Sequence, residues 1–135
     1  MTVEFALFSL TKFPSIVASS VLTAQVATLN PFVSVTSPND GKKHQYELAG
    51  YLNMTAFTNG SATFQISWTE SGIAHNGVSI VANQNGGLVS GVVGVSINNF
   101  FPAPIVADPN TAVILAFIVI GVNTSNVGGF INQLS

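Results

Sequence analysis

The chain has no cysteine and no arginine, and only 6% of its 135 residues are charged. Without cysteine it can form no disulfide, thiolate nucleophile or cysteine-based zinc site. The three lysines, Lys12, Lys42 and Lys43, together with a net charge of −2, provide no cationic surface of the kind that binds phosphate backbones. We therefore do not expect nucleic acid as a partner.

Long hydrophobic runs are also missing. The longest uninterrupted apolar run, residues 112–120, is less than half the length of a membrane-spanning helix. Glu4 precedes the first lysine, and serines interrupt the apolar stretch that follows it, which is a poor match to a signal peptide. Neither a membrane partner nor secretion is expected.

Groups for acid–base chemistry are few and scattered. They comprise two histidines and five acids: His44, His75, Glu4, Asp40, Glu47, Glu70 and Asp108. The common nucleophile, phosphate-binding and metal-binding motifs do not occur. Both histidines follow turn residues, where a solvated loop histidine is the ordinary outcome. The sequence predicts no catalytic residue, no metal site and no cofactor.

Apolar residues make up 47% of the chain, and many alternate with polar residues. In residues 62–69, Ala62, Phe64, Ile66 and Trp68 share one face and polar side chains share the other, as in a half-buried strand. Residues 46–55 alternate in the same way. The Asn59-Gly60 pair between these stretches favours a tight turn. We therefore predict an antiparallel hairpin over residues 45–71.

Further strands are predicted from short runs of apolar and β-branched residues separated by clusters of Gly, Pro and Asn. These strands cover residues 22–28, 32–36, 78–82, 92–97, 111–121 and 129–134. A helix over residues 14–28 is a weaker alternative, because β-branched residues and serines disfavour it. The pattern predicts one all-β domain, an antiparallel β-sandwich or jelly roll.

The domain is expected to span residues 21–135. Residues 1–20, with Phe5, Phe8 and Phe13, carry no matching turn signals, which indicates an extended N-terminal arm that packs on a neighbour. A first strand of the same sandwich explains them equally well.

The strand over residues 111–121 is apolar on both faces. One side of a sheet in a two-layer domain normally meets water, so this strand needs a second cover. Burying each large aliphatic side chain is worth roughly 1.5–3 kcal/mol. The cover is either the N-terminal arm or another subunit, and the shortage of charge favours a subunit. The expected interface residues are Ile114, Ala116, Phe117, Ile118 and Ile120.

Residues 21–69 carry a family resemblance. The relevant segments are Leu22-Thr23-Ala24-Gln25, the turn Pro38-Asn39-Asp40-Gly41, the aromatic strand at 46–55, and the strand at 63–72 that closes on Trp68-Thr69-Glu70-Ser71-Gly72. In this order they resemble the jelly-roll domains of the tumour-necrosis-factor and C1q type found in phage and bacterial structural proteins.

The resemblance implies a tight homotrimer around an apolar axis. It also implies a non-enzymatic virion protein that decorates the capsid exterior as a cement, with the major capsid protein as partner and Phe5, Phe8 and Phe13 in a capsid-contact arm. One alternative is a fibre-tip or lectin-like module that binds a receptor or a cell-surface glycan, for which Tyr51 is the candidate contact. Another is a bacterial C1q-like domain with no viral connection.

Overall fold

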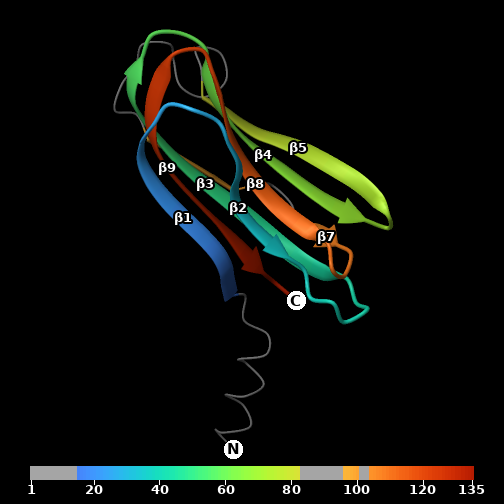
Figure 1. Cartoon of the computed structure of the whole chain (residues 1–135). Helices are drawn as coiled ribbons and strands as arrows, with labels where there is room; N and C mark the ends of the chain where they lie inside the picture. The colour runs from blue at the N-terminus through green and yellow to red at the C-terminus, as the bar shows by residue number, and fades with distance from the viewer. Residues whose placement is uncertain (1–14, 83–95, 101–103) are drawn as a thin grey trace, which may run out of the picture.

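The computed structural model describes residues 15–82, 96–100 and 104–135, which form strands and no helix (Figure 1). The strands are β1 Ser15–Gln25, β2 Leu29–Thr36, β3 His44–Phe57, β4 Ser61–Glu70, β5 Ile73–Ala82, β6 Ser96–Phe100, β7 Ile105–Ala107, β8 Ala112–Ile120 and β9 Asn123–Gln133. They form two antiparallel sheets packed face to face, so the predicted all-β sandwich is confirmed.

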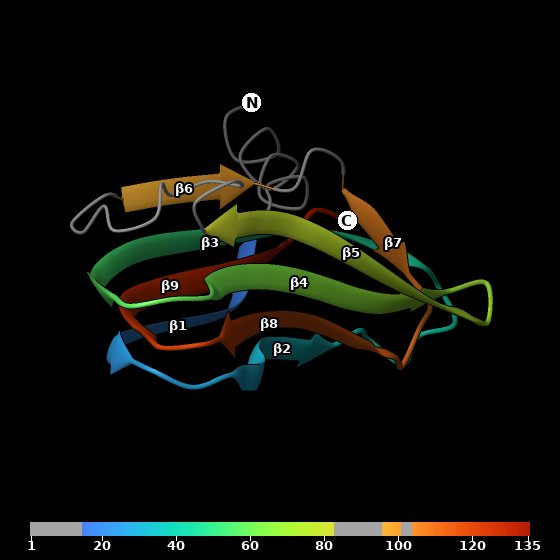
Figure 2. The ribbon, with the colours of Figure 1, turned by 90° about the horizontal axis from the view of Figure 1, so that it is seen from above.

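Figure 2 shows the two layers. In sheet A the strand order is β1-β9-β3-β6, and β7 pairs with the first residues of β3. In sheet B the order is β2-β8-β4-β5. Most consecutive strands belong to opposite sheets, so their connections cross from one layer to the other. In the described part these connections are β1–β2, β2–β3, β3–β4, β7–β8 and β8–β9.

The hairpin predicted over residues 45–71 is wrong. β3 pairs with β9, β6 and β7, whereas β4 pairs with β8 and β5. The Asn59-Gly60 turn exists, but it is a crossing between sheets that lies against the β8–β9 turn. Thr58 N–H donates to Val122 O at 2.9 Å, and a side chain on Gly60 would place its Cβ 1.8 Å from Ile120 O. Alternation defined the buried faces of β3 and β4 but not their partners.

A tight hairpin joins β4 to β5 instead. Its turn residues, Ser71 and Gly72, both have positive φ (54° and 75°), the conformation of the two-residue turns that suit strand twist. His75 therefore lies on β5, not in the predicted loop. Its ring stacks on that of Trp68 across the strand pair, with centroids 5.2 Å apart and planes 15° from parallel.

The expected domain boundary at residue 20 falls inside β1. Residues 15–20 pair with β9, from Ser15 opposite Gln133 to Ser20 opposite Gly129, so they belong to sheet A, as in the first-strand alternative. The helical alternative for residues 14–28 is likewise replaced by a strand over most of its length. Phe5, Phe8 and Phe13 lie outside the described residues.

The core is made by the inner faces of both sheets. Its most buried side chains are those of Tyr46, Leu48, Leu52, Met54, Phe64, Val113, Leu115, Phe117, Val127 and Ile131. The apolar phases predicted for residues 46–55 and 62–69 are the phases that face this core, with Trp68 packed at its margin.

Two glycines form the floor of the core in sheet A. Gly50 of β3 and Gly129 of β9 are directly opposite each other. A Cβ on Gly50 would lie 2.7 Å from the ring of Phe64, and one on Gly129 would lie 2.6 Å from Leu115 Cδ2. Because both positions are glycine, side chains of sheet B can pack directly against this part of sheet A. There the ring centroids of Phe64 and Phe117 lie 5.6 Å apart.

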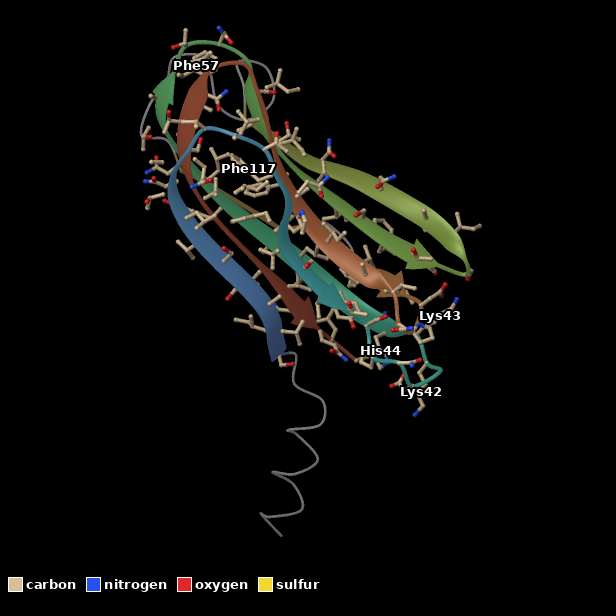
Figure 3. All side chains as sticks on the ribbon, viewed as in Figure 1. Lys42, Lys43, His44, Phe57 and Phe117 are labelled. Carbon is tan, nitrogen blue, oxygen red and sulfur yellow. The ribbon has the colours of Figure 1, made fainter. Side chains whose placement is uncertain are left out.

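Five of the six Asp, Glu and Lys residues in the described ranges gather at one end of the sandwich, which we call the charged end, and the sixth, Glu47, lies within β3. The charged end consists of the β2–β3, β4–β5 and β7–β8 connections, with Asp40, Lys42, Lys43, Glu70 and Asp108. Figure 3 labels Lys42, Lys43 and His44 there and Phe57 at the opposite end. The Asp108 carboxylate ties two of the connections together by accepting the Ser71 and Gly72 N–H groups, each at 2.8 Å.

Candidate subunit interface

The outer face of sheet A is apolar at its centre. The register places Val21 of β1, Gly128 of β9 and Tyr51 of β3 in one row, with Ser19, Phe130 and Ala49 in the next. Residues opposite each other in a sheet point to the same side. The inner face holds the neighbouring residues Gly50 and Gly129, so these two rows point away from the core.

A hollow of about 460 Å³ opens in this face. It is lined by Ile16, Ser19, Val21, Ala49, Gly50, Tyr51, Gly128, Gly129 and Phe130. None of these described residues is charged, and the hydroxyls of Ser19 and Tyr51 are the only polar side-chain groups among them. Gly128 leaves room for a side chain on this face. A Cβ added to it would lie 3.6 Å from its nearest neighbour, Val21 Cγ2, which is an ordinary contact distance. This sheet A hollow fits an apolar group.

The edge strand β1 borders the hollow. Val21 is 80% exposed, and Ile16, Val17 and Leu22 are exposed as well, so aliphatic side chains project from both faces of this strand. Ser15–Gln25 contains no Lys, Glu or Pro, the residues that usually protect an edge strand from pairing or packing with other chains. An apolar edge strand without these residues, beside an apolar hollow, is the candidate association surface of the described part of the chain.

Strand β8, the predicted interface, is only partly available. Phe117 is a core residue with 0% exposure, which corrects its assignment to an interface, because it shares the inward phase of Val113 and Leu115. Ala116, on the other face, is also buried within the protomer. Ile114 and Ile118 are half-buried, and Ile120 is 62% exposed at the β8–β9 turn. The interface prediction for these three isoleucines remains a prediction.

Tyr51 stands on the wall of the sheet A hollow. Tyr51, the candidate glycan contact, points outward from β3. Sugar sites need polar groups that converge on the ligand's hydroxyls, and among the described lining residues only Ser19 offers a further polar side chain. The surroundings of Tyr51 suit an apolar partner better.

Most of this face is not apparent from the sequence. Val21, Ala49, Gly128 and Phe130 were not singled out, and the predicted strand at 129–134 starts one residue after Gly128. Periodicity shows that two residues share a face, but it does not show which face a second layer will cover.

Within residues 15–82, 96–100 and 104–135, no three His, Asp or Glu side chains come close enough to hold a metal ion. In that same part of the chain, no helix is long and apolar enough to span a membrane. Comparisons with known protein families and with curated proteins found no match to this sequence.

Proposed function

We propose that this protein is a non-enzymatic structural protein of a phage virion, a homotrimer that decorates the capsid exterior and cements neighbouring capsid subunits. The apolar outer face of sheet A, with its hollow and its unprotected edge strand, carries the self-association. The resemblance to phage jelly-roll domains carries the virion role.

The strand order supports a jelly roll. Both β6 and β7 pair with β3, at different stretches of that strand, and can be treated as one interrupted strand. With that count the sheets run 1-8-3-6 and 2-7-4-5, the order in which two Greek keys fold into a jelly roll. This is the topology expected of the tumour-necrosis-factor and C1q type.

A closed ring of three subunits gives the apolar face its cover. When each copy turns the outer face of sheet A toward a common axis, Ile16, Val21 and the sheet A hollow are removed from water together. Transfer of each such aliphatic side chain from water is worth roughly 1.5–3 kcal/mol. Closed cyclic symmetry is also the usual form of homo-oligomers, since it leaves no apolar face unpaired.

The capsid contact is proposed for the arm that precedes β1. Because residues 15–20 belong to sheet A, the arm comprises residues 1–14, with Phe5, Phe8 and Phe13. It enters the fold at Ser15, which pairs with Gln133 at the end of β9, near the charged end.

Removal of residues 1–14 tests this role, since β1 stays whole. The shortened chain is expected to remain a folded trimer and to lose co-sedimentation with capsids of the phage that encodes it. Full capsid binding by the shortened chain would remove the arm from the account. Failure of the complete chain to bind those capsids would contradict the decoration role itself.

A further inference from the structure

His44 occupies a bridging position at the charged end. It is the first residue of β3, and its side chain is only 12% exposed, between the β2–β3 connection and the end of β9 (Figure 3). On one side, Nε2 lies 3.0 Å from each carboxylate oxygen of Asp40. On the other side, Nδ1 lies 2.9 Å from the main-chain oxygen of Ser135.

The two nearest partners of the ring, Asp40 and Ser135, are acceptors. A carboxylate and a main-chain oxygen can only accept hydrogen bonds, while a neutral imidazole carries one N–H group and one lone pair. The two contacts can therefore be donated together only by the imidazolium form of His44. These two short contacts favour the protonated ring.

The surrounding groups favour that form. The contact with Ser135 first, and then those with Asp40, raise the pKa of His44 above its ordinary 6.5. In turn, the bond from His44, followed by that from Lys42 N–H, lowers the pKa of Asp40 below 3.8, so the carboxylate stays charged. Burial raises the pKa of Tyr46, which keeps its phenol neutral.

Two other charges lie nearby on the same and facing connections. Lys42 opposes protonation of His44 by charge repulsion, but it is a lesser influence than the two hydrogen-bond partners. The Lys43 ammonium is turned to Asp108, 4.0 Å away, and to Ser71 Oγ at 2.7 Å. From β9, the neutral Gln133 amide lies 3.4 Å from His44 Nδ1 and donates to Ser135 O at 3.0 Å.

We propose that His44 is a pH-operated latch that joins the β2–β3 connection to the end of β9. The latch is closed while the ring donates to Asp40 and Ser135 at once. Loss of the ring proton opens it on the Ser135 side. This inference is independent of the proposed virion function.

The opening is one-sided because a neutral ring has a single N–H group for two acceptors. That proton stays on Nε2, which lies 3.0 Å from both carboxylate oxygens of Asp40, while the Gln133 amide, 3.4 Å from Nδ1, offers that nitrogen a donor. The lone pair of Nδ1 then faces Ser135 O at close range, and the contact becomes repulsive. Ser135 retains the Gln45 N–H bond to its Oγ, and Leu134 N–H retains Gln45 O, so the strand end loosens without leaving the sheet.

Nuclear magnetic resonance on the full chain tests the latch. The ring nitrogens of His44 and the backbone amides of Leu134 and Ser135 are followed from about pH 5 to 9. We expect all of them to shift together, with one midpoint above 6.5, and the neutral ring to carry its proton on Nε2. Amides of Leu134 and Ser135 that do not move while the ring titrates would overturn the proposal, as would a midpoint at or below 6.5.

Variants separate the latch from other titrations. H44Q should abolish the pH-dependent shift of the Ser135 amide, and H75Q, the matched histidine control on β5, should leave it unchanged. D40N keeps the shape of Asp40 but removes its charge, so the midpoint of the ring should fall toward 6.5. If H44Q is poorly folded, D40N alone decides, because an unchanged midpoint in that variant contradicts the latch.

Discussion

Each face of sheet A has a glycine of β9 that leaves space for a neighbouring group, but among the described residues that space is filled only on the inner face. Gly128 and Gly129 are adjacent in β9 and point to opposite sides of the sheet. The space beside Gly129 is filled by Leu115 and Phe32 of sheet B. The space over Gly128 is the sheet A hollow, which no described side chain fills. Small residues make space on a sheet for a second layer, and on the outer face no element of the described residues supplies that layer.

Gly129→Val is expected to have the largest effect on folding. Its Cβ would lie 2.6 Å from Leu115 Cδ2 and 3.1 Å from the ring of Phe32, so the core must shift to accept it. Overpacking of this kind costs about 1–3 kcal/mol or more. Urea unfolding measures the loss, and a variant as stable as the wild type would show that the inner face is not filled as described.

Val21→Glu is expected to have the largest effect on association. The residue is mostly exposed in the protomer, so the fold should tolerate the change, while a carboxylate buried between subunits costs several kcal/mol. Sedimentation should show a folded monomer. Ile73→Glu, at an exposed aliphatic position of the β4–β5 hairpin away from sheet A, is the control and should remain a trimer. Equal behaviour of the two variants would argue against the outer face as interface.

Gly128→Val sharpens the comparison within one dipeptide. The new side chain would fill the sheet A hollow, and its Cβ would meet Val21 Cγ2 at an ordinary 3.6 Å, so the stability of the protomer should change little. Self-association should weaken, because the valine side chain would occupy the sheet A hollow that another subunit is proposed to fill. Measured side by side, Gly129→Val should lower the urea midpoint and Gly128→Val should lower the association constant. The reverse result would show that the inner face mediates association and the outer face is the packed one.

The sequence predicted the elements and their buried phases better than it predicted their partners. Alternation identified the inward sides of β3 and β4, where Leu48, Leu52 and Phe64 are buried, because a period of two is a local property. It failed at the Asn59-Gly60 turn, since a two-residue turn between alternating strands serves a hairpin or a crossing between sheets equally well. Only the alignment with the β8–β9 turn decides between them.

The candidate interface was harder to foresee for a similar reason. Residues 111–121 are conspicuous because they are apolar throughout, yet Phe117 belongs to the core and Ala116 is covered within the protomer. The surface of sheet A is assembled from single residues of three strands that are distant in sequence. Its rows, such as Val21, Gly128 and Tyr51, exist only once the register is known.

Asp108→Asn is expected to have the smallest effect of the variants considered. The Gly72 and Ser71 N–H groups lower the pKa of Asp108 below 3.8, so its charged form stabilises the β4–β5 turn. That stabilisation is complete above pH 3.8 and is lost as the pH falls through the lowered pKa of the folded state. Thermal unfolding should show the wild type above the variant at pH 7 and the two converging in acid. A constant difference down to the lowest pH would exclude this role of the carboxylate.

The central claim, that the outer face of sheet A is covered by other copies of the chain, is tested most directly by the mass of the complete protein in solution. Sedimentation equilibrium over a wide range of concentrations should give three times the 14.0 kDa of a single chain, and Val21→Glu should reduce it to that of one. A wild-type protein that stays at 14.0 kDa at every concentration would contradict the account.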